Sequence, residues 1–385
     1  MKIVYCLPST YRMGGIERII LGKANILFEM GYDVSIITTD QQGKQPYFKL
    51  SDKVKCYDLG INYSQNKQRR FLKKLFYLFY NSYQHRKRLK KLLMDLKADI
   101  VISTFSNEMS LLPHIKDGSK KIVEFHFSRP MFRFIKRNGI LGYVDDFMMH
   151  KIICSLRKYD RSVVLSNEDA QNWKELNNVS VINNVCTINT DERANLEAHR
   201  VISVGRYESQ KGFDRLINVW ALIAQQASDW TLHIFGEGSL RPVLTKQIQD
   251  LHLENTVFLE GATNDIDKEL SKYSIAAFTS VYEGFLMAIA EAESKGLPVV
   301  SFNTPCGPKD IIRDEQDGFL VKNGDIEDFG KKLLSLMQDE ALRKRMGKKA
   351  FENSKRFTKE SIMPQWISLF ETVKKNESIC NCPNL

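Results

Sequence analysis

The stretch RVISVGRYESQKGFDRLINVWALIAQQ, residues 200–226, decides the fold that the sequence predicts. It opens with a β-branched apolar run typical of a buried strand, and after a short polar loop it continues as an amphipathic helix. A second strand-like run, WTLHIFG at 230–236, follows at once. Strand, helix and strand in this order form a βαβ unit, so we expect a parallel sheet.

The same alternation runs along the chain in two series. In the first series we expect strands at 2–8, 33–39, 98–104, 120–126 and 161–166, and in the second at 200–206, 230–236, 256–261, 275–280 and 297–302. Apolar strands that alternate with helices indicate parallel sheets covered on both faces. The predicted fold class is therefore α/β, with two Rossmann-like domains whose sheets face each other across a cleft.

The length of 385 residues agrees with two domains rather than one. An irregular polar stretch at 183–198 separates the two series of strands. We therefore expect an N-terminal domain over 1–185 and a C-terminal domain over 186–355. Residues 356–385 are expected to form a helix that crosses back over both domains, followed by a polar tail.

The composition is that of a soluble globular protein, with 43% hydrophobic and 26% charged residues. No apolar run approaches the ~18–20 residues that span a bilayer. The N-terminal MKIVYCLPST has too short an apolar stretch for a signal peptide and is interpreted as a first strand. We therefore expect a cytoplasmic protein.

The positive charge is concentrated in the N-terminal half. Residues 1–200 carry 33 Lys and Arg against 20 Asp and Glu, whereas residues 201–385 carry 23 against 26. Much of the excess lies in 67–97, where apolar and basic side chains alternate at helical spacing. This pattern favours contact with an anionic membrane surface, on the inner face of the cell membrane. The alternative is a helix packed through its apolar face, and nucleic acid is disfavoured because no nucleic-acid-binding motif accompanies the charge.

Ligands of open parallel sheets bind beside the carboxyl ends of the strands, so the loops that follow strands are the candidate sites. The first such loop is MGGIER, residues 13–18. Gly14 and Gly15 allow close approach of a ligand, and the following helix offers free amides to an anion. An ordinary glycine turn explains these residues equally well, and G-x-G-x-x-G is absent.

The second loop, VGRYESQKG, lies at the end of the strand at 200–206. Arg206 ends this strand and Lys211 precedes the next helix, so both cations are expected over one crevice. Arginine forms a fork for phosphate oxygens and lysine adds a movable charge. Two solvated surface cations are the alternative.

The third loop begins EGFLMAIAEAESKGLPVV, residues 283–300. Glu283 stands at the end of a strand, and Glu291 lies inside an apolar helix that starts near Leu286. A buried carboxylate needs a partner, and the start of a helix favours a phosphate. Two glutamates at this spacing also occur by chance about once in a chain of this length.

Together, these loops resemble those of the retaining glycosyltransferases of family 4, which have the GT-B fold. The resemblance covers most of the chain and is most specific in the C-terminal half, in the segments VGRYESQKGFDRLI, LHIFGEGSLRPVL, VFLEGATNDI and SVYEGFLMAIAEAESKGLPVVSFNTPCGPKDIIRDEQDGFLV. The chain looks most like the branch that builds capsular and other bacterial surface polysaccharides.

The resemblance implies a role for each matching position. Arg206 and Lys211 neutralise the diphosphate of the donor, Glu283 contacts the donor sugar, and His126 contacts the transferred sugar. A lone histidine at a strand end is more often structural, and only the resemblance favours the functional interpretation. The implied substrate-binding residues are Gly14, Gly15, Gly284, Phe285, Leu286, Met287, Glu291 at the ribose, and Gly236, Gly238 and Asn264 near the base.

The chain departs from the family pattern at two positions. Leu286 stands where the family usually has glycine, and Asn183 replaces a common proline. Neither change removes a charged site residue, so the departures affect the identity of the sugar rather than the reaction class.

The predicted function is retaining transfer of a hexose or N-acetylhexosamine from a nucleotide-diphosphate sugar, with UDP favoured, to a saccharide acceptor linked to polyprenyl diphosphate. No metal or other cofactor is expected, because the Arg and Lys side chains supply the positive charge. Two alternatives stay open, namely another sugar-nucleotide enzyme of the same fold, such as an epimerase, and a non-catalytic scaffold at the membrane.

Overall fold

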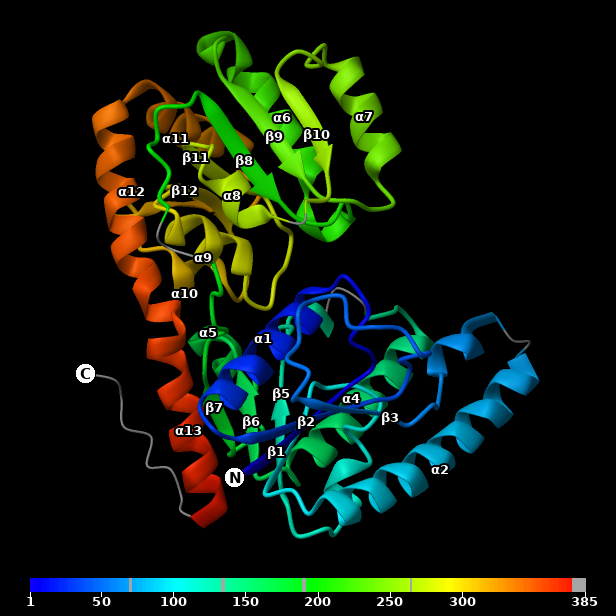
Figure 1. The fold of residues 1–385 in the computed structure, drawn as a ribbon. Coiled ribbons are helices and arrows are strands. Elements are labelled where there is room, and N and C mark those ends of the chain that lie inside the picture. The colour runs from blue at the N-terminus through cyan, green and yellow to red at the C-terminus, as the bar shows by residue number, and fades with distance from the viewer. Residues whose placement is uncertain (69–70, 133–135, 189–191, 264, 376–385) are drawn as a thin grey trace.

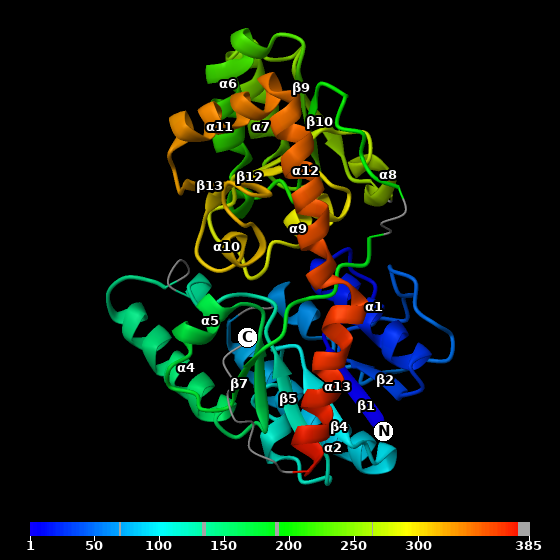
Figure 2. The same cartoon turned by 90° about the vertical axis from the view of Figure 1, so that its left-hand side faces the viewer.

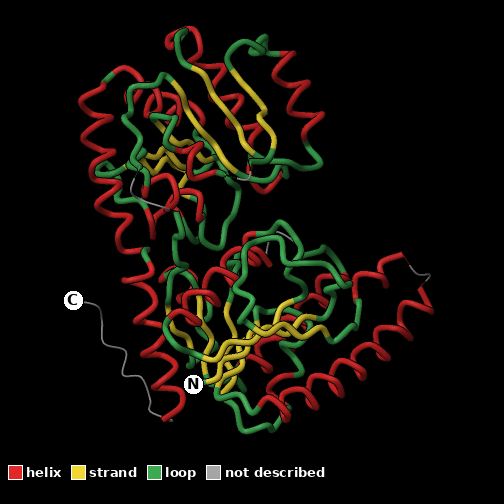
Figure 3. The backbone as a smooth tube through the Cα atoms, viewed as in Figure 1, coloured by secondary structure: helices red, strands yellow, loops and turns green. Residues whose placement is uncertain are grey.

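The computed structural model describes residues 1–68, 71–132, 136–188, 192–263 and 265–375. The chain folds into two lobes, each built on one parallel β-sheet with helices on both of its faces (Figure 1). Figure 3 shows the strands gathered in two separate sheets, with helices around them. The predicted α/β fold class with two Rossmann-like domains is confirmed.

The N-terminal sheet has seven parallel strands in the order β3-β2-β1-β4-β5-β6-β7. The strands are β1 (Lys2–Leu7), β2 (Asp33–Thr38), β3 (Lys55–Asp58), β4 (Ile100–Ser103), β5 (Lys120–Glu124), β6 (Arg161–Val164) and β7 (Val179–Val181). The helices are α1 (Gly15–Glu29), α2 (Phe71–Leu96), α4 (Ile140–Leu156) and α5 (Asn167–Asn172), with 3₁₀ turns η1 (Tyr63–Gln68) and η2 (Leu112–His114). α1 packs on one face of this sheet, and α2 and α4 pack on the other.

The C-terminal sheet has six parallel strands in the order β10-β9-β8-β11-β12-β13. The strands are β8 (Arg200–Val204), β9 (Thr231–Phe235), β10 (Val257–Gly261), β11 (Ile275–Phe278), β12 (Val299–Asn303) and β13 (Gly318–Lys322). The α-helices are α6 (Phe213–Ile223), α7 (Arg241–Asp250), α8 (Ile266–Leu270), α9 (Met287–Ser294), α10 (Pro308–Ile311), α11 (Ile326–Gln338) and α12 (Glu340–Ser354). The 3₁₀ turns are η3 (Ser209–Lys211), η4 (Ala224–Ala227) and η5 (Lys355–Phe357).

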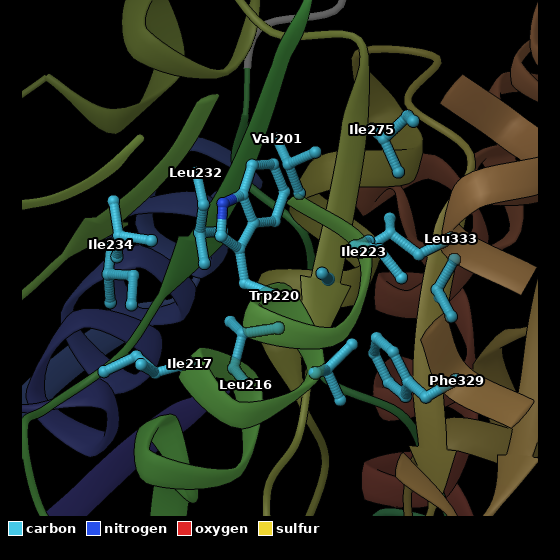
Figure 4. Packing of buried hydrophobic residues seen from close by; sticks show 14 of the residues in the cluster. Val201, Leu216, Ile217, Trp220, Ile223, Leu232, Ile234, Ile275, Phe329 and Leu333 are labelled. Atoms are coloured by element: carbon cyan, nitrogen blue, oxygen red, sulfur yellow. The ribbon is translucent and has the colours of Figure 1, made fainter. Parts of the chain in front are cut away.

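The helix that the opening stretch predicts is α6, and its apolar face fills the core of the C-terminal domain. Trp220 is buried between Val201 of β8 and Leu232 of β9 (Figure 4). α6 can start where it does because Gly212 adopts φ 63° and has no side chain. A Cβ at Gly212 would lie 2.4 Å from the carbonyl oxygen of Thr279, so the loop before α6 can lie directly against the loop after β11.

The C-terminal end of the chain joins the two domains. α12 belongs to the C-terminal domain, and α13 (Lys359–Lys375) continues past it along the N-terminal domain (Figures 1 and 2). Phe357 packs on Phe285 of the C-terminal domain, with ring centroids 5.5 Å apart. Trp366 and Phe370 of α13 are buried in the N-terminal core beside α1. The apolar pattern expected around 356–375 therefore serves both domains.

Three strands of the sheets were not expected from the sequence. β3 and β7 are outermost in the N-terminal sheet and their side chains are only partly buried, so neither shows the continuous apolar run of a central strand. β13 is outermost in the other sheet and begins at Gly318. Such short edge strands are specified by their neighbours more than by their own composition.

Candidate active site

The carboxyl ends of β8 and β11 lie side by side at the edge of the C-terminal sheet that faces the N-terminal domain (Figure 1). The chain winds outward from β8 to β9 and β10 in one direction, and from β11 to β12 and β13 in the other. This reversal is the topological switch point at which open parallel sheets bind ligands. The loops after these two strands carry Arg206, Lys211 and Glu283.

Direct hydrogen bonds hold these two loops together. The amide of Val281 donates to the carbonyl of Gln210 at 2.8 Å, and the Gln210 side chain donates to the carbonyl of Tyr282 at 3.1 Å. The hydroxyl of Thr279 donates to the carbonyl of Gly212 at 2.7 Å. Because backbone atoms fix both loops, the side chains between them have defined positions.

Lys211 and Glu283 form an ion pair at this junction, with 2.7 Å between Nζ and Oε1. The two side chains are 16% and 7% exposed, so the pair is largely shielded from water. The ion pair compensates the burial of the Glu283 carboxylate and fixes its direction. The structure thus brings together two residues that the sequence placed at one site.

Arg206 follows Gly205, whose backbone lies against the Lys211 side chain at the carboxyl end of β8, and the Arg206 side chain itself is exposed. Its charge also acts on Glu208, whose pKa is lowered by hydrogen bonds from Ser239 and, to a smaller extent, by Arg206. An exposed guanidinium next to a shielded Lys–Glu pair is available to an anionic ligand. The expected role of Arg206 at a diphosphate stays a prediction.

Gly284 is a point of close backbone approach between the two domains. A Cβ at this position would lie 2.7 Å from the Cα of Phe127 and 2.9 Å from the carbonyl oxygen of His126. Next to it, the hydroxyl of Ser128 donates to the carbonyl of Glu283 at 2.6 Å. The end of β5 in the N-terminal domain therefore lies against the Glu283 loop.

The start of α9 presents its backbone rather than its side chains to this site. Phe285 and Leu286 are buried in the core of the C-terminal domain, and Met287 packs against the same core. Leu286 precedes the first helical residue, and no side chain caps α9 there. The unpaired amides of a helix start suit an anion. Leu286 stands where the family usually has glycine. Because its side chain points into the core, the substitution affects the conformational freedom of the backbone more than the surface of the site.

Glu291 is buried on α9, and its partner comes from the other domain. Nη1 of Arg18, on α1, lies 2.8 Å from Oε1 of Glu291. Arg18 is not among the residues expected from the sequence. The signal that identifies it is its position in the MGGIER loop, a cation in the first turn of a helix that begins at a candidate ligand loop.

Gly14 and Gly15 stand where the chain turns into α1. Gly14 precedes the helix with an extended backbone, and α1 begins at Gly15. A Cβ at Gly15 would meet no atom within 4 Å, whereas one at Gly14 would meet only the flexible end of Glu17. Open space beside Gly15 is consistent with a ligand loop, and its contact with phosphate stays a prediction.

His126 follows β5, and its imidazole is buried within the N-terminal domain. Its Nε2 lies 3.5 Å from Oε1 of Glu124, which is itself bonded to the buried Lys23. Burial lowers the pKa of His126 to about 4, with Glu124 opposing the shift. The ring is therefore neutral near pH 7. Its carbonyl oxygen, by contrast, faces Gly284 of the other domain.

Gly236 and Gly238 bring the loop after β9 against the loop after β8. A Cβ at Gly236 would lie 1.8 Å from the carbonyl oxygen of Gly205, and one at Gly238 would lie 2.4 Å from that of Tyr207. Both glycines therefore have a packing function that supports the Arg206 loop. Asn264, the remaining residue expected near the base, lies outside the described residues.

Within the ranges that the structure describes, no group of three or more His, Cys, Asp or Glu side chains is placed to hold a metal ion. The expectation that no metal is used stays a prediction. No helix of these ranges has both the length and the apolar composition that crossing a bilayer requires.

Comparison with known proteins gives a family match within the C-terminal domain and relatives that cover most of the chain. Residues 187–353 match the family described as glycosyl transferases group 1, and this match includes the β8 and β11 loops and Glu291. An uncharacterized glycosyltransferase of Haemophilus influenzae is 29% identical over 377 residues, which are 95% of this chain and 98% of the relative. The amylovoran biosynthesis glycosyltransferase AmsD of Erwinia amylovora is 26% identical over 95% of this chain and 98% of its own length.

A third relative is the Campylobacter jejuni N-acetylgalactosamine-N,N'-diacetylbacillosaminyl-diphospho-undecaprenol 4-alpha-N-acetylgalactosaminyltransferase. It is 26% identical over 71% of this chain and 76% of its own length. Among solved structures, a TarM variant of S. aureus, in complex with fondaparinux, alpha-GlcNAc-glycerol and UDP, superimposes with a TM-score of 0.79. That match has 20% identity and covers 96% of this chain and 99% of the other. The chain is thus a glycosyltransferase with the GT-B fold, and residues 187–353 of its C-terminal domain match the group 1 glycosyl transferases.

Proposed function

We propose that this enzyme transfers a hexose or N-acetylhexosamine from a UDP-sugar and retains the configuration at the anomeric carbon. The observation that carries the proposal is the Lys211–Glu283 ion pair, which lies beside Arg206 at the switch point of the C-terminal sheet. The structural neighbour TarM was solved with UDP, which supports the choice of nucleotide.

The donor would lie along the carboxyl ends of β8 and β11. Its diphosphate would meet Arg206, Lys211 and the amides at the start of α9, all of which suit anionic oxygens. Its sugar hydroxyls would donate to Glu283, and its ribose hydroxyls would donate to Glu291. Lys211, Glu283 and Glu291 are already held in position by ion pairs, so little reorganisation of these groups is needed on binding.

In the reaction, the bond between the anomeric carbon and the diphosphate oxygen breaks, and the electron pair goes to the diphosphate. Arg206 and Lys211 stabilise the negative charge that develops there. A diphosphate oxygen then takes the proton of the acceptor hydroxyl, which attacks the same face of the sugar. No covalent sugar–enzyme intermediate is proposed. No metal ion is proposed either, because the two cations supply the positive charge.

The N-terminal domain would complete the site from the opposite side. Gly14 and Gly15 would approach the phosphates, and His126 would approach the transferred sugar. The contacts of Gly284 with the end of β5 support this arrangement, because they bring the His126 carbonyl next to the Glu283 loop. Exclusion of water by the two domains would limit hydrolysis of the donor.

We propose a saccharide linked to polyprenyl diphosphate as the acceptor, within the synthesis of a bacterial surface polysaccharide. The Campylobacter relative carries diphospho-undecaprenol in the name of its substrate, and the Erwinia relative is named for the synthesis of amylovoran. An acceptor of this kind is anionic and anchored in a membrane. The enzyme would therefore work at the inner face of the cell membrane.

Two helices of the N-terminal domain support contact with such a membrane. α2 exposes Phe79 and Tyr83 next to the exposed Arg86 and Lys87, a mixture of aromatic and basic groups that suits an anionic interface. The side chains of residues 66–76, including the basic start of the predicted 67–97 helix, lie outside the described part.

α4 carries a second apolar surface that the sequence did not point to. Tyr143, Val144, Phe147 and Met148 are each between 45% and 79% exposed on this helix. α2 and α4 pack on the same face of the N-terminal sheet, so their outer surfaces look away from it on the same side. An apolar surface and a basic surface on the same side of the domain favour a lipid interface.

The experiment that tests the donor proposal is nucleotide release from a panel of UDP- and GDP-sugars. We expect release of UDP from at least one UDP-sugar, increased by a lipid-linked acceptor, and its loss in Lys211→Ala and Glu283→Ala. Release of GDP alone would overturn the choice of base. Release that is unaffected by both substitutions would overturn the site.

A further inference from the structure

The ion pair between Arg18 and Glu291 joins the two domains at the residue to which the proposed function assigns the ribose. Its atoms, Nη1 and Oε1, are 2.8 Å apart. Glu291 is only 9% exposed at its side chain, whereas Arg18 is 32% exposed. A carboxylate buried on an otherwise apolar helix face would be costly without a counter-charge. The N-terminal domain supplies that counter-charge, and among the described residues no cation of the C-terminal domain forms an ion pair with Glu291.

The surroundings of the pair indicate that it lies where the domains are connected. The thiol of Cys186, in the segment between the two domains, has its pKa raised to about 12 by burial and by Glu291, and Arg18 opposes this shift. The amide of Cys186 donates to the carbonyl of Phe357, where the chain crosses back. Arg18 therefore meets Glu291 close to the two segments, around Cys186 and Phe357, through which the chain passes between the domains. A change in the angle between the domains displaces side chains least near these segments.

We propose that Arg18 is a positioning residue for donor binding, which holds Glu291 from the opposite domain so that the carboxylate is set to accept the ribose hydroxyls. This inference rests on the proposed function, since it assumes that the ribose binds at Glu291. Arg18 itself need not touch the nucleotide.

The geometry suits this role. Arg18 occupies Oε1 of Glu291, and among the described residues no hydrogen bond is recorded to Oε2. An arginine that fixes one oxygen orients the whole carboxylate, because the group is planar and its rotation is then restricted. The ribose could therefore bind at Oε2 without displacing the ion pair, and the nucleotide affinity would depend on a residue of the N-terminal domain.

The opposite arrangement makes a different prediction. If the ribose bound at the same oxygen of Glu291 as Arg18, the nucleotide would have to break the ion pair. Removal of Arg18 would then tighten the binding of the nucleotide. A positioning role predicts weaker binding instead. The sign of the change in affinity therefore separates the two roles.

The test is calorimetric titration of the full-length protein with UDP, followed by donor kinetics. In Arg18→Gln we expect the Kd for UDP and the KM for the donor to rise about tenfold, while kcat at saturating donor changes less than threefold. Arg18→Lys should recover most of the affinity, because it restores the counter-charge. The double variant R18Q/E291Q should bind UDP no more weakly than Glu291→Gln alone, since the two residues act through one interaction.

Lys309→Gln provides a matched control. Nζ of Lys309 pairs with Glu168 of the N-terminal domain at 3.2 Å, so this variant also loses an ion pair between the domains, but one that does not involve Glu291. Its affinity for UDP should stay within twofold of the wild type. An equal loss in Lys309→Gln and Arg18→Gln would overturn the inference, because domain contact in general would then explain both.

Three results separate this inference from the function on which it rests. Unchanged or tighter UDP binding in Arg18→Gln, with weaker binding in Glu291→Gln, overturns the role of Arg18 alone. Unchanged binding in Glu291→Gln overturns the assignment of the ribose, and the role of Arg18 with it. No binding of UDP to the wild type overturns the choice of donor nucleotide.

Discussion

Lys211 and Glu283 are 72 positions apart in the chain, yet their side chains form a 2.7 Å ion pair where β8 and β11 end. The pair exists because two loops of adjacent strands are held together through their backbones. It holds the Glu283 carboxylate, which we propose accepts a hydrogen bond from a sugar hydroxyl of the donor. The first prediction concerns the carboxylate of this pair.

Glu283→Gln keeps the shape of the side chain but removes its charge. We expect kcat/KM for the sugar donor to fall by about 10²–10³, the range seen when a fixed charge-stabilising group is lost from an active site. Lys211 loses its partner at the same time and with it its position. UDP release under initial-rate conditions measures the effect. Activity within threefold of the wild type would mean that Glu283 does not contact the donor.

Gly284→Ala should force the two domains apart at a tight backbone contact. The added Cβ would lie 2.7 Å from the Cα of Phe127, and backbone atoms on both sides leave no flexible group to give way. We expect a loss of about 1–3 kcal/mol in the free energy of unfolding, as is usual for overpacking, together with a raised KM for the donor. Thermal and urea denaturation measure the free energy of unfolding, and initial rates measure the KM for the donor.

Gly22→Ala is the matched control for Gly284→Ala. A Cβ at Gly22, inside α1, would lie 3.5 Å from Thr187, which is an ordinary contact. Since alanine favours the helix over glycine by about 0.5–1 kcal/mol, this variant should be as stable as the wild type or more so. Equal destabilisation by the two substitutions would contradict the account of Gly284.

Two buried histidines should make the stability fall in mild acid. Burial lowers the pKa of His126 and that of His85 to about 4, with Glu124 and Asp40 opposing the shifts. In the unfolded chain both pKa values are near 6.5. Between these values the unfolded state binds protons that the folded state does not, so stability decreases as the pH falls from about 6.5 to 4.

Urea denaturation at pH 7 and pH 5 measures this loss. We expect each histidine to contribute on the order of 2 kcal/mol to the difference between the two pH values. His126→Gln should therefore reduce the difference, because one of the two titrating groups is gone. The same pH dependence in His126→Gln and the wild type would show that this ring is not buried as a neutral group.

The apolar surface of α4 should control binding to vesicles. We expect Phe147→Ser combined with Met148→Ser to lower co-sedimentation with vesicles of 30% phosphatidylglycerol severalfold, because each side chain loses its contact with lipid. Val243→Ser is the control, since Val243 is equally exposed, at 59%, but lies on α7 of the C-terminal domain. An equal loss in the control would contradict a specific surface on α4.

The basic groups of α2 call for a separate substitution. Arg86→Glu with Lys87→Glu should weaken binding to anionic vesicles and leave binding to neutral ones unchanged. Arg88 is unsuitable, because its guanidinium donates to the carbonyl of Leu59 at 2.6 Å and supports the fold. Unchanged co-sedimentation at low salt would contradict a membrane role for α2.

The sequence predicted the α/β fold because its central strands are apolar on both faces. Runs such as those of β1 and β12 bury nearly every residue, and this pattern is visible without a structure. β3 and β7 were not predicted, since a strand with one neighbour and exposed side chains has little pattern of its own. Their pairing depends on the register of the strand beside them.

For the site, the sequence indicated loops more reliably than partners. Arg206, Lys211 and Glu283 could be assigned to one edge because parallel strands end together. The partner of Glu291 could not be found in this way, because Arg18 belongs to the other domain, and only the angle between the domains brings the two together. The burial of the His126 ring likewise depends on Glu124 and Lys23, from two different elements.

The central claim is that the edge formed by β8 and β11 carries the transfer reaction, with Arg206 and Lys211 at the leaving diphosphate. The most direct test is kcat/KM for UDP-sugar turnover in Arg206→Ala and in Lys211→Ala, with Lys349→Ala as the control, since Lys349 is an exposed lysine of α12 that pairs with Glu352 of the same helix. We predict a fall of at least about a hundredfold in each of the first two variants and a change of less than threefold in the third. Turnover within threefold of the wild type in both Arg206→Ala and Lys211→Ala would contradict the account.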